Sequence, residues 1–207
     1  MGRTAKSYNR SKPRFKPQPT VLVICEDSKS GKRYIEDATK HYRVNVKVLV
    51  MHAGRTDPKG IVEEALRQAK HYDQVFCAID RDTHETFDEA LRLARGSAKI
   101  DVIASYPCIE FWYLLHFGFN RRGYVRAGAK SPGECAIDDL RRCRNMEGYA
   151  KGAGLSVFDG LQPLLEGAII TSERVLQQAV AENEFNPSTR MHVLMKHFQL
   201  LSTPQLA

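Results

Sequence analysis

The sequence has no apolar run near the length that crosses a bilayer, and its N-terminus lacks the apolar core of a signal peptide. We therefore expect a soluble, cytoplasmic protein without a membrane partner. The five cysteines include no Cys-x-x-Cys pair. Their odd number and wide spacing argue against both a disulfide framework and a structural zinc site. We expect reduced thiols, most of them buried.

Acidic residues are missing from the first 20 positions, which hold six lysines and arginines. This stretch contributes +6 to a formal net charge of +7, so the rest of the chain is nearly neutral. Residues 1–17 are rich in Pro, Ser, Lys and Arg, and they cannot bury enough apolar surface to offset the entropy of ordering. We interpret them as a flexible basic arm, which is either a solubilising tail or an arm that orders on a phosphate backbone.

The chain has 207 residues, of which 43% are hydrophobic, enough for one ordinary domain and a small appendage. Four short apolar runs rich in β-branched residues predict strands, and apolar residues recur at helical spacing between them. This alternation predicts an α/β fold: a four-stranded parallel sheet with right-handed crossovers and helices on both faces. The strands are expected at 21–25, 44–50, 74–80 and 99–105.

Signals at the ends of the expected helices agree with this scheme. Asp57 with Pro58 predicts the start of the second helix, Thr83 with Thr86 the start of the third, and Gly96 its end. Further helices are expected at 108–119, 135–143, 168–182 and 188–201, and a basic, glycine-rich loop is expected at 121–134. We divide the chain into the arm at 1–17, an α/β domain at 18–120 and a C-terminal helical extension at 121–207.

Carboxylates follow three of the predicted strands. Glu26 comes after the first strand, Asp80 and Asp82 stand at the end of the third, and Glu110 opens the helix after the fourth. Because parallel strands end at one edge of a sheet, we expect these side chains to lie close together. Oxygen ligands without paired His or Cys suit a hard cation such as Mg²⁺ or Mn²⁺.

The Asp80-Arg81-Asp82 spacing points both carboxylates to one face if the chain stays extended, while Arg81 points elsewhere. A cation would relieve the repulsion between the two like charges. The alternative is structural: Asp82 caps the third helix, Asp80 is a turn residue, and Glu26 is a strand-end carboxylate that faces water. His84, which is close to Asp82 in the sequence, is a candidate neighbour of the metal site.

Basic residues near this edge are candidates for phosphate contacts. The stretch 28–32 does not complete a P-loop, because Glu26 stands where that pattern needs glycine. Lys29 and Lys32 nevertheless lie where a strand leads into a helix N-terminus. Each candidate has an alternative as a solvated surface charge. The full set of expected nucleic-acid contacts is Lys29, Lys32, Arg55, Arg121, Arg122 and Lys151.

Several motifs in order resemble the RloB-like family of Toprim-containing proteins over roughly residues 18–200. They are VLVICEDSKSGKRYIED, AIDRDTH, SYPCIEFWYLLHF, Tyr149-Ala150-Lys151 and NPSTRMHVLM. A glutamate followed by D-x-D is the Toprim signature of topoisomerases, bacterial primases and OLD-family nucleases. The resemblance implies a Toprim-like fold, a Mg²⁺- or Mn²⁺-dependent nuclease acting on DNA or RNA, a role in antiviral defence, and a partner protein from a defence locus.

Residue by residue, the resemblance assigns Glu26 as acid/base or metal ligand and Asp80 and Asp82 as metal ligands. Glu110 matches the glutamate of the family's P-C-x-E-x-W block, and we count it among the catalytic candidates. Many relatives carry C-E-G-x-x-T-E, whereas this chain has Gly31 at the position of the second carboxylate. Any role assigned to that position is therefore lost here.

Two other functions stay open at this point: a non-catalytic nucleic-acid or protein-binding module of a defence complex, and a phosphatase or nucleotidyl-transfer enzyme acting on small molecules. Tyr149 is either a stacking platform, a nucleophile or ordinary packing, of which we favour packing. The apolar run around Trp112 offers a surface for a homodimer.

Overall fold

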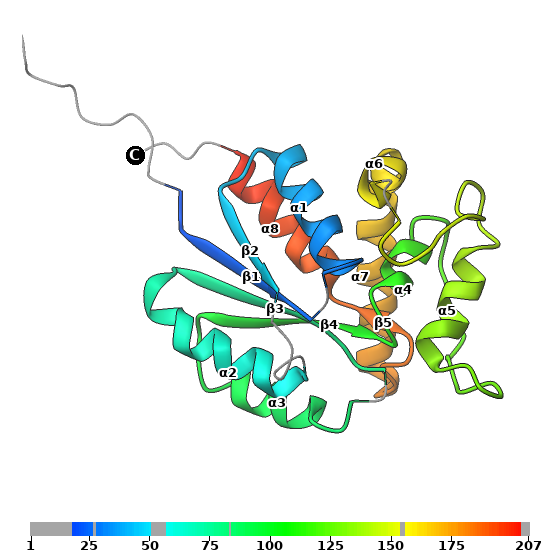
Figure 1. Cartoon of the computed structure of the whole chain (residues 1–207), viewed down its shortest axis with the longest axis horizontal. Helices are drawn as coiled ribbons and strands as arrows, with labels where there is room; N and C mark the ends of the chain where they lie inside the picture. The colour runs from blue at the N-terminus through cyan, green and yellow to red at the C-terminus, as the bar shows by residue number, and fades with distance from the viewer. Residues whose placement is uncertain (1–17, 27, 51–56, 83, 154–155, 204–207) are drawn as a thin grey trace, which may run out of the picture.

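The computed structural model describes residues 18–26, 28–50, 57–82, 84–153 and 156–203. Its centre is a sheet in the order β2-β1-β3-β4-β5 (Figure 1). The four predicted strands are present and mutually parallel, which confirms that part of the prediction. Their bounds are β1 (Val21–Cys25), β2 (Val46–Val50), β3 (Gln74–Asp80) and β4 (Ile100–Tyr106).

The fifth strand, β5 (Ser188–Thr189), pairs antiparallel with β4 and was not predicted. The expected helix from Ser188 is wrong for its first three residues, because α8 begins only at Met191. The Ser105 and Thr189 hydroxyls, 2.9 Å apart, form a buried hydrogen bond between the two strands. Two residues are too few to show the alternation that identifies a strand.

Helices cover both faces of the sheet (Figure 1). On one face lie α1 (Gly31–Tyr42) and α8 (Met191–Ser202), and on the other lie α2 (Pro58–Gln68) and α3 (Phe87–Ala94). Successive strand residues alternate between two hydrophobic clusters: Val21 and Val23 face α1, whereas Leu22 and Ile24 face α2 and α3. A 3₁₀ turn, η2 (Ala69–His71), follows α2.

The predicted helix starts are found, with one difference in their bonding. Asp57 precedes α2, and Pro58 stands in its first turn. The Asp57 carboxylate does not cap its own helix; it accepts a hydrogen bond of 2.9 Å from Thr86 Oγ1 and so ties the start of α2 to the start of α3. Thr83 lies outside the described residues.

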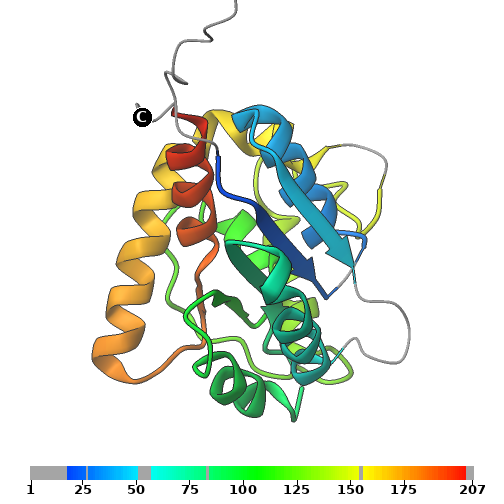
Figure 2. The same cartoon turned by 90° about the vertical axis from the view of Figure 1, so that its left-hand side faces the viewer.

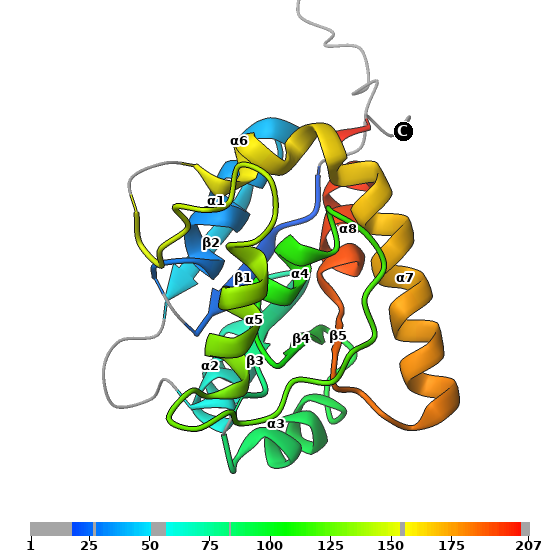
Figure 3. The same cartoon turned by 90° about the vertical axis from the view of Figure 1, so that its right-hand side faces the viewer.

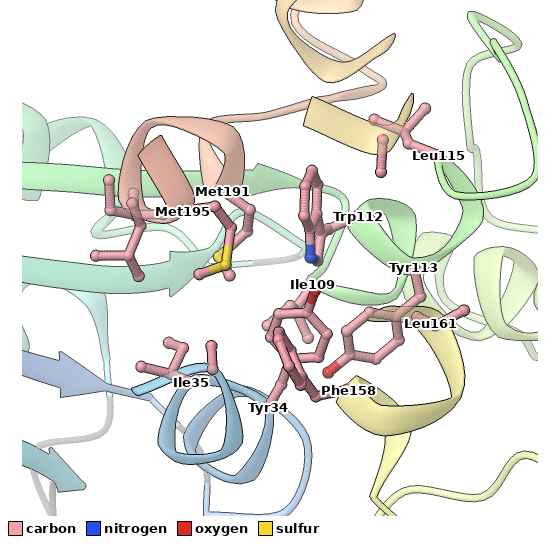
Figure 4. Packing of buried hydrophobic residues seen from close by; sticks show 14 of the residues in the cluster. Tyr34, Ile35, Ile109, Trp112, Tyr113, Leu115, Phe158, Leu161, Met191 and Met195 are labelled. Atoms are coloured by element: carbon pink, nitrogen blue, oxygen red, sulfur yellow. The ribbon is translucent and has the colours of Figure 1, made fainter. Parts of the chain in front are cut away.

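The apolar run 108–119 forms a much shorter helix than predicted. Only α4 (Glu110–Leu114) is helical, and three-residue turns follow it until Gly118, whose φ of 143° favours glycine. Figure 4 shows Trp112 among the side chains of the core, and its exposed fraction is 0%. Trp112 is buried within its own chain, so its ring is not available to a partner, and the homodimer stays a prediction.

The remaining helices complete the core on the α1 side. They are α5 (Pro132–Leu140), α6 (Val157–Leu161) and α7 (Leu165–Glu182), with a 3₁₀ turn, η3 (Gln162–Leu164), between the last two. Helices α7 and α8 lie side by side (Figure 2). The larger hydrophobic cluster contains residues from both 18–120 and 121–207, so the two predicted segments share one core.

Two further sequence expectations concern cysteines and membranes. Cys25, Cys77 and Cys108 are buried, and among the described residues no cysteine forms a disulfide, as predicted. Within that same part of the chain, no helix is both long and apolar enough to span a membrane. The basic arm at 1–17 lies outside the described residues.

Candidate functional site

Three of the predicted carboxylates line one cleft at the carboxyl edge of the sheet. Glu26 directly follows β1, Asp80 ends the neighbouring strand β3, and Asp82 lies two residues further on. The cleft has a volume of about 590 Å³, and α5 contributes its other side. Figure 3 looks towards this edge, where α5 lies across the ends of β1 and β3. The parallel pairing of β1 and β3 thus brings together residues more than fifty positions apart.

Glu26 is held by two groups from the chain after β3. Its Oε2 accepts a hydrogen bond of 3.0 Å from the Asp80 backbone N–H. Its Oε1 lies 2.7 Å from His84 Nε2, and both side chains are partly buried. Sequence reasoning treated His84 as a possible neighbour of the metal site and missed its contact with Glu26, because a pair 58 residues apart leaves no local pattern.

Asp82 occupies a turn rather than an extended chain. Its φ is 21°, and its backbone N–H donates to Pro107 O at 2.8 Å. Asp80 and Asp82 both line the cleft while Arg81 does not, as the alternate spacing predicted. Arg81 instead donates to His84 O at 2.7 Å and lies over the Phe87 ring.

One oxygen of Asp82 makes the strongest case for a bound cation. Oδ1 is buried and accepts no hydrogen bond within the described part of the chain. A buried anionic oxygen without a partner is costly, and a cation would compensate it. Nearby oxygens belong to Asp80 and Glu26, a donor set that suits Mg²⁺ or Mn²⁺. These residues therefore fit the expected metal.

The carboxylates do not form a ready-made metal cage. Among the residues that the structure describes, no group of three or more His, Cys, Asp and Glu side chains is arranged to hold a metal ion. The two oxygens of Glu26 contact His84 and the Asp80 amide. The predicted metal set of Glu26, Asp80 and Asp82 thus stays a prediction.

Cationic side chains also line the cleft. Lys130 precedes α5, Arg141 follows its last turn, and Lys151 lies on the chain beyond it. Arg141 is oriented by a 2.9 Å hydrogen bond from its Nε to Tyr149 O, and Lys130 pairs with Asp138. A capping box at Ser131 fixes the start of α5 beside them. The sequence signal for Lys130 was the basic loop at 121–134; Arg141 had none.

The family comparison covers this whole arrangement. A family model described as RloB-like protein matches residues 21–198, from β1 through most of α8. The chain belongs to the RloB-like family. This membership confirms the resemblance seen in the sequence motifs. No curated protein and no solved structure matches the chain at a significant level.

Glu110, in the P-C-x-E-x-W block of this RloB-like chain, lies behind the cleft rather than in its lining. It is fully buried at the start of α4. The preceding strand, β4, ends at the same edge of the sheet as the strands that carry the other carboxylates. Its Oε1 accepts a 2.7 Å hydrogen bond from Tyr149 Oη and lies 3.4 Å from Lys151 Nζ. Glu110 is therefore connected to the cleft by its contact with Lys151, which is one of the lining residues.

Tyr149 packs in the core, as favoured from the sequence, and it also lines a second cavity. Its ring is buried, and burial raises the pKa of its hydroxyl well above the usual value, with the charge of Glu110 raising that pKa further. A hydroxyl that holds its proton so firmly is a poor nucleophile.

Four described residues among the predicted phosphate contacts do not line the cleft. Lys29 lines a neighbouring cavity, and Lys32 lies 3.3 Å from Glu36 on the next turn of α1. Arg121 donates to Pro187 O at 2.6 Å and contacts Glu182, which ties the loop after α4 to the end of α7.

Arg122, also predicted as a phosphate contact, pairs with Asp139 on α5 and lies over the Tyr124 ring. Among the predicted contacts, Lys151 lines the cleft, and Arg55 lies outside the described residues. Arg121 and Arg122 contact other parts of the protein and are not in the lining of the cleft. Their roles in binding nucleic acid remain predictions.

Proposed function

We propose that this RloB-like protein is a metal-dependent nuclease of the Toprim type, which hydrolyses phosphodiester bonds of DNA or RNA and serves in antiviral defence. The observation that supports it most is Oδ1 of Asp82, which is buried and has no hydrogen-bond partner among the described residues, on a side chain that lines a cleft of carboxylates and cations. A phosphodiester bound to a cation needs both kinds of group: anions for the metal and cations for the remaining phosphate charge.

Each side chain then has a role that its position allows. Asp80 and Asp82, with Glu26, would hold Mg²⁺ or Mn²⁺, which when bound neutralises charge on the phosphate. Lys151 and Arg141 orient the phosphate from the α5 side of the cleft. As a base instead of a metal ligand, Glu26 takes a proton at Oε1 from the water whose oxygen bonds to phosphorus, and His84 lies 2.7 Å from that Oε1. The P–O bond to the leaving oxygen breaks in the same step, and the proton held by Glu26 then passes to that oxygen.

The proposal is tested with purified protein, Mg²⁺ or Mn²⁺, and end-labelled duplex DNA, single-stranded DNA, bulk RNA and tRNA. We expect cleavage of at least one class, and a loss of about 100-fold or more in Asp82→Asn with binding retained. Asp88→Asn on the exposed side of α3 is the matched control, and it should cleave like wild type. Binding without cleavage in wild type would refute the nuclease and support a non-catalytic nucleic-acid-binding module.

A further inference from the structure

A second cavity, of about 270 Å³, lies between α1 and residues 145–153 and 156–160. Tyr34 and Arg33 of α1 line one side, and Tyr149, Ala150 and Gly160 line the other. Figure 3 shows α6 beside α1 at this end of the molecule. The surface of the cavity is mainly apolar, and Lys29 and Arg33 add positive charge.

Hydrogen bonds fix the walls of this cavity to α1. Arg33 Nη1 donates to Ala153 O at 2.8 Å and to Gly152 O at 3.3 Å. Ser156 Oγ, at the start of α6, donates to Asp37 Oδ2 at 2.8 Å. The two sides come from distant parts of the sequence, and these hydrogen bonds hold them together.

The cavity and the cleft share one structural element. Tyr149 and Ala150 line the cavity, and the next residue, Lys151, lines the cleft. Tyr149 Oη and Lys151 Nζ both contact Oε1 of Glu110, at 2.7 and 3.4 Å. The buried carboxylate thus holds a short piece of chain whose two ends face two different cavities.

We propose that this cavity, here called the base pocket, binds one unpaired nucleobase of a single-stranded nucleic acid whose backbone crosses the cleft. This inference rests on the proposed function and names its substrate class. Ligand cavities commonly measure about 300–1,000 Å³, so a volume of 270 Å³ suits a single base rather than a larger ligand. A flat, apolar base attached to an anionic backbone matches an apolar cavity with Lys29 and Arg33 at its side.

Duplex nucleic acid keeps its bases stacked inside the helix, where this pocket cannot reach them. Single strands, loops and extruded nucleotides expose their bases at little cost. The base pocket therefore selects unpaired substrates, while the cleft contacts the phosphate backbone without reading its sequence.

Two glycines allow the pocket to be filled without disturbing the fold. A Cβ built at Gly160 or at Gly148, both in the lining, meets no atom within 4 Å. Gly160→Leu and Gly148→Leu thus add a bulky side chain to the lining of the pocket without a clash at Cβ. Gly167→Leu on α7 is the matched control, because its Cβ also meets nothing within 4 Å and it does not line the pocket.

The measurement is fluorescence anisotropy with a labelled single strand of about ten nucleotides, compared with an all-abasic strand of equal length and charge, without added metal. We expect wild type and Gly167→Leu to prefer the base-bearing strand by about tenfold, since stacking on one base contributes roughly 1–3 kcal/mol. Gly160→Leu and Gly148→Leu should bind the two strands equally. Equal binding by wild type, no binding by wild type, or an unchanged preference in both pocket variants would overturn the base pocket.

Cleavage of the same two strands with Mn²⁺ separates this inference from the nuclease. Cleavage of both strands by wild type, without any preference in binding, would leave the nuclease standing and refute the base pocket. A base preference in binding that both pocket variants abolish, without cleavage of either strand, would refute the nuclease and keep the base pocket.

Discussion

Two buried histidines should make the fold lose stability on mild acidification. His116 follows α4, and burial lowers its pKa from 6.5 to about 4. His192 on α8 shows the same lowering, from 6.5 to about 4, again because of burial. Each ring has a hydrogen-bond partner: His116 Nδ1 lies 3.0 Å from Trp112 O, and His192 Nδ1 lies 2.8 Å from Ser172 Oγ. The Trp112 carbonyl raises the pKa of His116, but burial outweighs it.

These pKa values determine how the free energy of unfolding changes with pH. Above pH 6.5 the rings are neutral in both states, so stability is at its full value there. As the pH falls from 6.5 towards 4, the unfolded chain binds protons that the folded chain does not, and the free energy of unfolding decreases. At pH 5 the loss is about 2 kcal/mol for each histidine, or about 4 kcal/mol for the pair, a large part of a typical total of about 5–15 kcal/mol.

Urea unfolding at pH 7.5 and pH 5, followed by the fluorescence of the buried Trp112, measures this loss. His116→Asn with His192→Asn should lower stability at pH 7.5 but remove more than half of the difference between the two pH values. The half-buried His197, whose pKa is also lowered, accounts for the remainder. A wild-type free energy of unfolding that stays constant over this range, or an unchanged difference in the double variant, would refute the reasoning.

Three further predictions concern the metal, the core and the wall of the cleft. In a thermal scan, saturating Mg²⁺ should raise the unfolding temperature of wild type by a few degrees but not that of Asp82→Asn. A ligand that binds only the folded state adds about 2.7 kcal/mol of stability at 100 times its dissociation constant. Equal shifts in both proteins would contradict the metal site. Trp112→Ala should cost about 3–5 kcal/mol in urea unfolding followed by circular dichroism, because the ring is fully buried; a loss below about 1 kcal/mol would contradict that packing. Ser131→Ala should cost about 1 kcal/mol through loss of its capping box with Glu134, whereas Ser97→Ala in the loop after α3 should cost less, and chemical denaturation of both variants checks the difference.

The sheet and three carboxylates of the site could be predicted because they depend on local patterns. Apolar β-branched runs identify the parallel strands, and parallel strands necessarily place Glu26 and Asp80 at one edge. The place of Asp82 in the cleft could be predicted from its spacing to Asp80. The chain at Asp82 is a turn with a positive φ, however, and not the extended chain on which that prediction was based.

Other parts of the site depend on tertiary contacts that leave no periodic signal. Glu110 shares its edge with the other carboxylates, but its helix turns it inward to Tyr149. The pairing of His84 with Glu26 and the approach of Arg141 to the cleft require the folded sheet and the packed α5. β5 is defined by its pairing with β4 and not by its own two residues.

One contact of the fold joins two segments that are far apart in the sequence. Gln18 Nε2, just before β1, donates to Leu201 O on α8 at 2.9 Å, across 183 positions. One apolar face of β1 belongs to a cluster that includes both α1 and α8, so that face is only partly covered on the ribosome until α8 emerges. At about 5–20 residues per second, the nascent chain waits many seconds with its first strand half covered. This long-range closure makes the edge of the sheet that carries Glu26 depend on the packing of α8, because the strand before Glu26 shares its core with that helix.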